Sequence, residues 1–441
     1  MDVCVPNNFV KLETKSEFPR RRELKRPIPF GSENLVPPKK SKKSEERSRS
    51  YIHQSKFISD RYENLTLIGK GSFGMVYRAV PKDSSRKYVA IKEILKPITG
   101  RKDDQHHVVC EIELVQKLGG KNNILQTFEV YRDLGAYIVM EYFPHDDFKT
   151  IVKDMDASEI IMYIKNLVSA LQYLHQSNII HRDTKPDNFL YNRKQRRYAL
   201  IDFGLAQYYN NNLDRSEALK RRFGSLGGAN NRRSTIEMPC LCEGKLISPC
   251  SSCQIKPEFI VNKAGTPRFL APEVLIGVNK QTTKIDIWAA GMMLFYLITR
   301  KYPFFHAKDN LAMVAELAAI FGTQSFIQVA KEHGMDLTFG FSFRSLNIIQ
   351  FAFSHRYKNS GGQLSIPIHC DYCNEYFQGN TPVENQTEIG CFCRQMEISE
   401  SSQTLNDKLD QEMAEMLASC LQVNPMERIS SDEFVNKFNK S

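Results

Sequence analysis

Hydrophobic residues follow two different spacings along this chain, and the change from one to the other divides it. Up to about residue 143, short segments rich in β-branched and aromatic residues have the extended pattern of strands, with one segment of helical spacing among them. The pattern therefore predicts a small β-rich part that contains a single helix. Strands are expected at 62–68, 75–77, 88–92, 124–131 and 136–142, and the helix at 108–118.

From residue 156 onward, apolar residues recur at helical spacing, so the second part is expected to be mostly helical. Two stretches, about 208–262 and about 331–405, show no sustained period and are interpreted as insertions in a single fold. The predicted fold class is α+β, with a small part at 62–143 and a large part at 144–441. The clearest helical segments are 160–175, 283–299 and 310–321.

The composition is typical of a soluble globular chain, because 41% of its 441 residues are apolar and 25% are charged. The longest apolar stretch, 287–298, is too short to cross a bilayer. The first residues lack the basic region, apolar run and cleavage site of a secretory signal. We therefore expect a reducing compartment, cytosolic or nuclear.

Most of the positive charge lies near the N-terminus. Residues 1–60 hold 14 Lys and Arg against 8 Asp and Glu, and so supply +6 of the net charge of +10. Basic runs at 20–22 and 39–43, with little apolar periodicity, predict a solvated, disordered tail over 1–61. We interpret it as a nuclear import signal; nucleic-acid contact and a solubilising tail are the alternatives.

Eight of the eleven cysteines lie in four close pairs within the two insertions. Without a secretory signal, this spacing argues against disulfides. Two pairs of thiolates can complete a tetrahedral Zn²⁺ site and fold a segment that lacks a core; exposed free thiols are the alternative. The predicted ligands, in two sites or one shared site, are Cys240, Cys242, Cys250 and Cys253, and Cys370, Cys373, Cys391 and Cys393.

A glycine-rich turn connects the first two predicted strands. Residues 69–74 read Gly-Lys-Gly-Ser-Phe-Gly, and a strand follows them rather than the helix of a dinucleotide-binding domain. This context suits a β-hairpin lid whose backbone N–H groups close over phosphates, with glycines where a side chain would block the approach.

Further motifs follow in a fixed order. They are Val-Ala-Ile-Lys at 89–92, Glu111, His-Arg-Asp-Thr-Lys-Pro-Asp-Asn at 181–188, Asp-Phe-Gly at 202–204 and Ala-Pro-Glu at 271–273. Together they resemble the eukaryotic protein kinase family over about residues 62–441, less the insertions. The resemblance implies the bilobal kinase fold, with a β-rich N-lobe and a helical C-lobe, and phosphoryl transfer from ATP with Mg²⁺.

The resemblance also implies which residues hold the phosphates. Lys92 would contact the α- and β-phosphates and pair with a glutamate of the predicted helix. Glu113 is a rival for that place by spacing, but Glu111 is favoured because Leu114 and Val115 then pack against the sheet.

Four residues of the later motifs would act on the transferred group. Asp183 would accept or orient the proton of the substrate hydroxyl, and Lys185 would neutralise the moving phosphate. Asn188 and Asp202 would hold magnesium through oxygen ligands. The catalytic residues are therefore predicted to be Asp183, Lys185, Lys92 and Glu111.

The nucleotide pocket is assigned in the same way. Met140 resembles the gatekeeper residue, 141–143 the adenine-binding hinge, and Asp147 a ribose contact. The full predicted set of ATP-contacting residues is Ile68, Gly69, Gly71, Ser72, Gly74, Val76, Ala90, Lys92, Glu141, Phe143, Asp147, Asn188 and Asp202.

Other matches concern specificity and architecture. Lys185 two residues after Asp183, with Gly-Thr-Pro at 265–267, resembles serine/threonine kinases rather than tyrosine kinases. Glu273 and Arg428 match a structural ion pair of the family. Asp286 and Trp288 match its core helix.

A narrower resemblance lies in 181–192, in 198–207 and in the two long insertions. These features look like the cell division cycle 7-related kinases that trigger replication origins. The match implies a catalytic subunit activated by a regulatory subunit of the dumbbell former four type. Its implied substrates are subunits of the minichromosome maintenance helicase.

The activation segment supports dependence on a partner. No Ser or Thr lies between Cys253 and Gly265, where many kinases place a phosphate that pairs with the Arg of His-Arg-Asp. We expect Arg182 to be served by an acidic residue such as Glu258, or to be left unpaired.

Family members favour an acidic residue after the target hydroxyl, and Arg268 is the candidate to bind it. Leu270 stands where a basic residue would be expected in the family.

Two other functions remain open at this point. One is another nuclear serine/threonine kinase, of casein kinase or cyclin-dependent type, although the cyclin-binding helix sequence of the latter is absent. The other is a zinc-bearing pseudokinase scaffold. The complete set of Lys92, Asp183, Asn188 and Asp202 argues against a scaffold, which has no chemical need for all four.

Overall fold

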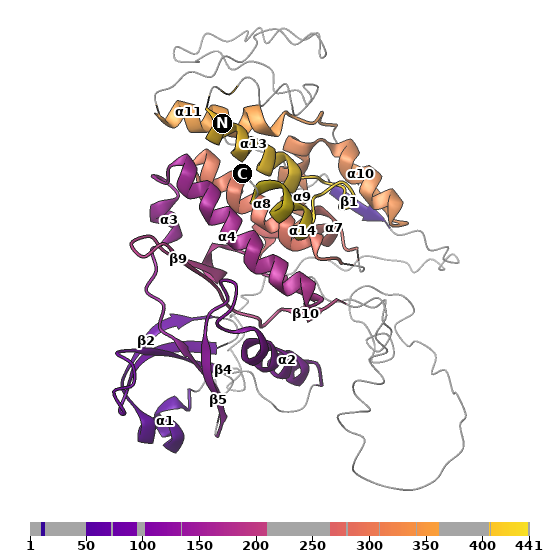
Figure 1. Cartoon of the computed structure of the whole chain (residues 1–441). Helices are drawn as coiled ribbons and strands as arrows, with labels where there is room; N and C mark the ends of the chain where they lie inside the picture. The colour runs from indigo at the N-terminus through magenta and orange to yellow at the C-terminus, as the bar shows by residue number, and fades with distance from the viewer. Residues whose placement is uncertain are drawn as a thin grey trace, which may run out of the picture. The chain divides into compact units, whose positions relative to one another are not determined.

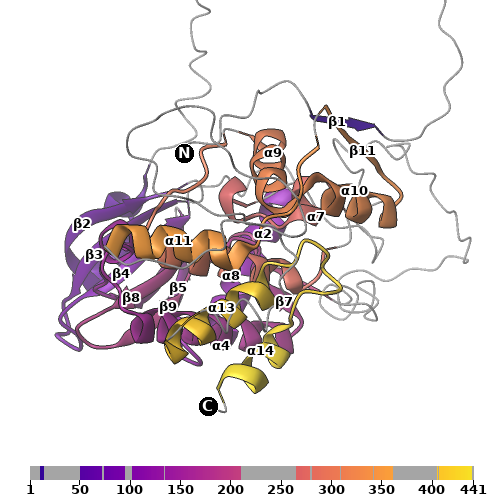
Figure 2. The ribbon, with the colours of Figure 1, turned by 90° about the horizontal axis from the view of Figure 1, so that it is seen from above.

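The computed structural model divides the chain into two compact units, a smaller one of residues 13–119 and 126–142 and a larger one of 1–12, 120–125 and 143–441. The residues that the structure describes are 10–13, 50–71, 74–94, 102–133, 135–209, 265–278, 281–307, 309–340, 342–360, 405 and 407–439. Figures 1 and 2 show the elements of both units from two directions.

The small unit contains a five-stranded antiparallel sheet with the order β2-β3-β4-β6-β5. Each strand overlaps a predicted one, with ends that differ by up to four residues. The helix α2 begins six residues before the predicted segment. The bounds are β2 Tyr62–Lys70, β3 Gly74–Pro81, β4 Val89–Ile94, α2 Lys102–Leu118, β5 Thr127–Arg132 and β6 Ala136–Glu141.

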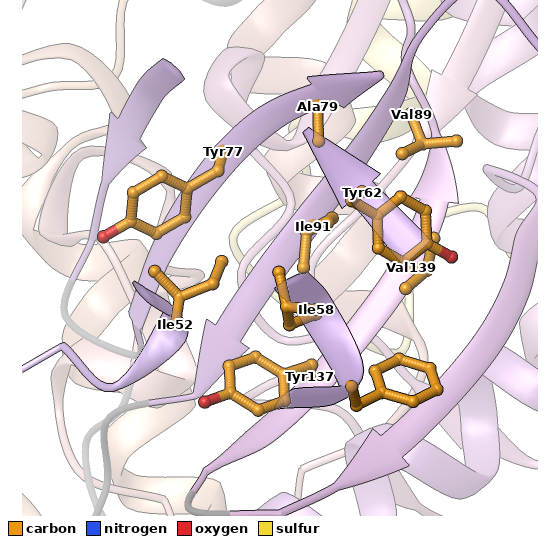
Figure 3. Close-up of a cluster of buried hydrophobic side chains, with 10 residues drawn as sticks. Ile52, Ile58, Tyr62, Tyr77, Ala79, Val89, Ile91, Tyr137 and Val139 are labelled. Atoms are coloured by element: carbon orange, nitrogen blue, oxygen red, sulfur yellow. The ribbon is translucent and has the colours of Figure 1, made fainter. Parts of the chain in front are cut away.

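Alternation along the strands gives this sheet two apolar faces. On one face, Ile94 of β4 packs with Ala136 and Ile138 of β6 and with Val108 of α2. The other face carries Tyr77, Ala79, Val89, Ile91, Tyr137 and Val139, whose side chains are drawn in Figure 3. Because both faces are apolar, each must be covered.

The cover of this second face corrects the sequence analysis, which placed all of residues 1–61 in a disordered tail. Residues 50–61 are ordered and form the short helices η3 Ile52–Gln54 and α1 Lys56–Arg61. Ile52, Phe57 and Ile58 are buried in the cluster of Figure 3. The prediction failed because twelve residues give too short a window for a helical period next to a strongly basic stretch.

The large unit is mostly helical and is organised around α8, Lys284–Thr299. Every residue of α8 from Ile285 to Thr299 is buried, as expected of a helix that is apolar on all sides. Helices α4 Ala157–Gln176, α11 Ile348–Ser360 and α13 Lys408–Cys420 pack against it (Figure 2). Helix α14, Ser431–Phe438, begins with a capping box and packs on α4.

The remaining elements of the large unit are helices α9 and α10 and several shorter strands and helices. Two hairpin-like pairs, β7 with β10 and β8 with β9, flank the catalytic motifs. The bounds are β1 Val10–Glu13, α3 Phe148–Ile151, β7 Ile179–Ile180, η4 Pro186–Asn188, β8 Phe189–Asn192, β9 Arg197–Leu200, β10 Gln207–Tyr208, η5 Pro267–Phe269, α7 Pro272–Leu275, α9 Asn310–Phe321, α10 Thr323–Glu332 and β11 Asp336–Phe339.

The boundaries expected from the sequence need two changes. Residues 120–125 belong to the large unit because Ile124 bridges to Leu200, and Leu125 and Leu200 donate backbone hydrogen bonds to Leu200 and Asn123. The second predicted insertion begins too early: β11 and α11 lie inside it, and Ile349, Ala352 and Phe353 of α11 are buried. Both faces of α11 mix polar and apolar residues, which hides its period.

Across the described ranges, no single helix is long and apolar enough to span a membrane, although α9 and α10, bent by 118°, pass that test together. The five-stranded sheet and the helical unit confirm the α+β kinase fold class.

Candidate active site

Lys92 lies on the central strand β4, and its side chain makes an ion pair with Glu111 of α2. The Nζ–Oε1 distance is 2.5 Å, and the two side chains are 11% and 4% exposed. Glu111, favoured over Glu113 in the sequence analysis, is therefore the partner that the structure shows. A buried pair of this kind fixes the direction of the lysine, which a phosphate-binding cation requires.

The described glycines of the glycine-rich segment lie where β2 ends and β3 begins. Gly69 pairs with Val76, and the Gly71 N–H donates to the Gly74 carbonyl at 2.9 Å. A Cβ on Gly74 would lie 2.0 Å from the carbonyl oxygen of Glu93, so only glycine fits there. Ser72 lies outside the described residues.

Other predicted nucleotide contacts are divided between the two units. Ile68, Val76, Ala90 and Glu141 belong to the small unit, where Ile68 is 48% exposed. Phe143 and Asp147 belong to the large unit. Phe143 is buried with the Arg197 guanidinium 5.1 Å from its ring, and Asp147 is exposed before α3 and accepts from Thr150.

Asp183 is the centre of a polar network in the large unit. Its Oδ2 accepts from Lys185 Nζ at 2.7 Å and from Asn188 Nδ2 at 3.0 Å. Its Oδ1 accepts from Thr266 Oγ1 at 3.0 Å, and this hydroxyl accepts from Lys185 at the same distance. The network holds a carboxylate acceptor beside an ammonium group, which is the pairing that proton acceptance and charge neutralisation at a phosphoryl group require.

Asn188 and Asp202 are brought together by the strand pair β8–β9. Asn188 precedes β8 and Asp202 follows β9, and the Ile201 N–H donates to the Asn188 carbonyl at 2.9 Å. Because Asn188 donates its Nδ2 to Asp183, its side-chain oxygen is left to act as an acceptor or ligand. Within the described ranges, no cluster of three or more His, Cys, Asp or Glu could hold a metal ion. Mg²⁺ is nevertheless commonly bound by one or two oxygen ligands from the protein, while phosphates and water complete its coordination.

Asp286 of α8 fixes the backbone of the catalytic motif. Its carboxylate accepts from the N–H groups of His181 at 2.8 Å and Arg182 at 2.9 Å, and from His175 Nε2 at 3.0 Å. Burial acts to raise the pKa of Asp286, but the hydrogen bond from His175 and the interactions with His181 outweigh it and lower the pKa. From the sequence, Asp286 was assigned to the core helix only. Its role in positioning the catalytic motif is visible only from the contacts in the folded chain.

Arg182 is also held within the large unit. Burial lowers its pKa to about 10, although Asp286 acts in the opposite direction. Its guanidinium donates to Gln281, to Gln207 and to the Leu205 carbonyl. These contacts are with neutral acceptors; Glu258, the expected acidic partner, lies outside the described residues.

The backbone of the motifs shows local strain. Arg182 and Asp202 have φ angles of 69° and 64°, in the left-handed region, which is uncommon for residues other than glycine. Such outliers concentrate at functional sites, where the surrounding contacts maintain them.

The eight predicted zinc ligands, Cys240 to Cys393, lie outside the described residues. The two described cysteines, Cys110 and Cys420, are buried. Arg268, the candidate for acid recognition, is half-buried and donates Nε to the Phe305 carbonyl at 3.0 Å, whereas Leu270 is buried.

The fold and these residues define a protein kinase. The family model described as "Protein kinase domain" matches residues 62–226 and 250–438.

Relatives give the particular family. The "Probable cell division control protein 7 homolog 2" of Encephalitozoon cuniculi is 33% identical over 65% of this chain and 78% of its own length. The "non-specific serine/threonine protein kinase Cdc7" of Drosophila melanogaster is 25% identical over 89% of this chain and 76% of its own length. The human "Cell division cycle 7-related protein kinase" is 25% identical over 64% of this chain and 69% of its own length. The chain therefore belongs to the cell division cycle 7-related serine/threonine protein kinases.

Proposed function

We propose that this kinase initiates DNA replication by phosphorylating Ser or Thr in subunits of the minichromosome maintenance helicase, in the nucleus and together with an activating regulatory subunit. The observation that supports the proposal is the similarity to cell division control protein 7 relatives over most of the chain. The kinase domain uses ATP and Mg²⁺. Its substrates, compartment and partner are inferred from the family resemblance.

The proposed mechanism begins with the substrate hydroxyl. Asp183 orients this hydroxyl and accepts its proton as the oxygen attacks the γ-phosphorus of ATP. Thr266 and Asn188 hold the Asp183 carboxylate by hydrogen bonds of 3.0 Å, so that it is directed before the substrate binds. Lys185, 2.7 Å from Asp183, neutralises charge on the transferred phosphoryl group.

The phosphates of ATP are contacted by a lysine and by backbone N–H groups. Lys92, aligned by Glu111, contacts the α- and β-phosphates, and backbone N–H groups of the glycine-rich turn cover them. Asn188 and Asp202 would hold Mg²⁺ through oxygen ligands, and the ion would supply charge neutralisation at the phosphates.

The decisive experiment measures phosphate transfer from ATP to an N-terminal tail of a minichromosome maintenance subunit. The chain is assayed alone and with its presumed regulatory subunit, and Asp183→Asn is the control for catalysis. Activity that requires both the subunit and Asp183 supports the proposal. Strong activity of the chain alone on unrelated proteins, such as casein, keeps the kinase and rejects the replication assignment.

The substrate sequence is a further part of the proposal. Both terminal nitrogens of Arg268 lack a hydrogen-bond partner among the described residues, so they can bind an acidic side chain that follows the target hydroxyl. A peptide array should show a preference for Asp, Glu or phosphoserine at that position, and Arg268→Ala should remove it. Equal transfer to neutral peptides rejects acid recognition.

Zinc binding rests on cysteine spacing alone. Elemental analysis of the purified chain should find one or two Zn²⁺ per molecule, and Cys240→Ser with Cys242→Ser should reduce that number. A metal-free wild-type chain that is fully active rejects the zinc sites.

A further inference from the structure

A buried carboxylate lies on the outer apolar face of the small unit's sheet. Glu93 of β4 is fully buried, and its direct neighbour Lys92 points to the opposite face, where it meets Glu111. Glu93 accepts hydrogen bonds from Ser50 Oγ and from the Tyr51 backbone N–H, both at 2.6 Å. Burying a carboxylate among apolar side chains is costly unless such donors are present.

Both donors come from the segment that covers this face. Residues 50–61, which we call the N-terminal strap, bury Ile52, Phe57 and Ile58 against the sheet (Figure 3). Ser55 starts helix α1 and donates to Asp133 at 3.0 Å, and Lys82 donates to the Ser59 carbonyl. The strap is thus attached at both ends, and Glu93 provides the attachment at its first residue.

The attachment at Ser50 is sensitive to charge. The Ser50 hydroxyl is half-buried, donates to Glu93 Oε2 and lies 3.1 Å from the Tyr77 hydroxyl. A phosphate on this oxygen would remove the donated proton and place about −1.5 to −2 charges beside a buried carboxylate. Like charges at this distance, away from water, repel strongly.

We propose that Ser50 is a phosphorylation site, and that its phosphate releases the N-terminal strap from the sheet. An ATP-dependent protein kinase forms the Oγ–P bond while the bond from the γ-phosphorus to the bridging oxygen breaks; ADP leaves, and the kinase's base takes the hydroxyl proton. Arg47 and Arg49 precede Ser50 in the sequence, so a kinase that binds arginine before the target hydroxyl fits.

The addition takes place when the end of the strap is transiently open, since terminal segments open more readily than core strands. Release uncovers an apolar face of the strand that carries Lys92. Release of the strap does not depend on the substrate or the partner proposed above.

The test introduces phosphoserine at position 50 of the full chain by genetic encoding. Hydrogen exchange followed by mass spectrometry should show that amides of residues 52–61 lose protection by about tenfold or more. Trypsin should cut faster after Lys56. The matched control is phosphoserine at the exposed Ser59, whose hydroxyl donates to the Lys56 carbonyl in the same helix. This control should change exchange by less than about twofold.

A second variant tests whether the Glu93 carboxylate causes the release of the strap. In Glu93→Gln the carboxylate charge is gone and the amide can donate to the phosphate, so phosphoserine at 50 should leave the strap protected. An unchanged exchange pattern in the phosphoserine-50 chain overturns the release. Equal loss of protection with Glu93→Gln overturns the role of this carboxylate.

The site itself is tested with the catalytic subunit of an arginine-directed protein kinase and ATP. Mass spectrometry should find phosphate at position 50 in the full chain and none there in Ser50→Ala. No incorporation at Ser50 in the wild type overturns its assignment as a modification site.

Discussion

Arg428 makes a bidentate ion pair with Glu273 in the interior of the large unit. Nη1 and Nη2 lie 2.8 Å and 3.0 Å from the two carboxylate oxygens, and the side chains are 0% and 3% exposed. The same guanidinium donates to the carbonyls of Lys284 and Gln422. The pair therefore ties α7, which follows the activation segment, to the loop before α14.

Loss of this pair should destabilise the large unit severely. Arg428→Ala leaves the buried Glu273 carboxylate without its partner, and the free energy of unfolding should fall by about 3–5 kcal/mol. Urea denaturation measures the change. The exposed pair of Lys437 with Glu415 is the matched control, because Lys437→Ala should cost less than about 1 kcal/mol. Equal losses for the two variants would contradict the assignment.

Thr266 should act through the position of Asp183. Its hydroxyl is 3.0 Å from both Asp183 Oδ1 and Lys185 Nζ, so Thr266→Val removes two contacts at nearly constant volume. A misplaced catalytic group can cost up to about a hundredfold in rate, and we expect kcat to fall by about tenfold or more with KM for ATP unchanged. Steady-state phosphotransfer checks this.

Thr266→Ser is the control, because it keeps the hydroxyl and should retain most of the activity. If Thr266→Ser is as slow as Thr266→Val, the hydroxyl is not the group that matters.

Short motifs predicted residues that the structure brings into contact, namely Lys92 with Glu111 and Asp183 with Lys185 and Asn188. Lys92 lies in a strand motif and Asp183 in a loop motif, and both motifs have a fixed spacing. Glu111 was chosen because the predicted helix had to supply the ion-pair partner of Lys92. The same holds for Glu273 and Arg428, whose ion pair the structure confirms.

Contacts between residues far apart in the sequence could not be predicted where no matched motif pairs them. Asp286 supports the backbone of His181 across more than 100 residues, and no local spacing reveals which N–H groups a helix aspartate will meet. The N-terminal strap was missed because its apolar residues Ile52, Phe57 and Ile58 are few and follow a basic stretch. Burial against a sheet, rather than local propensity, orders them.

Acid should weaken the fold through Asp286. The pKa of this carboxyl is lowered in the folded chain, because the hydrogen bonds from His175 and His181 outweigh burial, which acts to raise it. A depressed folded pKa means that the stabilisation is complete above the unfolded pKa of about 3.9 and is lost as pH falls through the folded value. The wild type should lose stability progressively below about pH 4.

The variant Asp286→Asn isolates this contribution. It should be less stable than the wild type at pH 7, and its free energy of unfolding should change less between pH 7 and pH 3, as measured by urea denaturation at each pH. Asp60→Asn, at an exposed position, is the control and should stay within about 0.5 kcal/mol of the wild type. An acid dependence in Asp286→Asn as steep as that of the wild type would exclude this carboxyl as its source.

The ion pair between Lys92 and Glu111 should matter for phosphate contact as well as for folding, because both side chains are buried. In Lys92→Met the cation is lost at similar length, and in Glu111→Gln the lysine remains but is no longer held by a charge 2.5 Å away. Both variants should lower kcat/KM for ATP, Lys92→Met by about a hundredfold or more and Glu111→Gln by less, because a misdirected cation still neutralises part of the phosphate charge.

The matched control is Glu113→Gln on the same helix, which leaves the pair of Lys92 and Glu111 in place. Steady-state kinetics with ATP as the varied substrate, together with the thermal midpoint of each variant, separates the two effects. The assignment requires low kcat/KM in Lys92→Met and Glu111→Gln at a temperature well below their thermal midpoints, where both variants remain folded, and near-native activity in Glu113→Gln. If Glu113→Gln loses as much activity as Glu111→Gln, the ion pair seen in the structure does not identify the functional partner of Lys92.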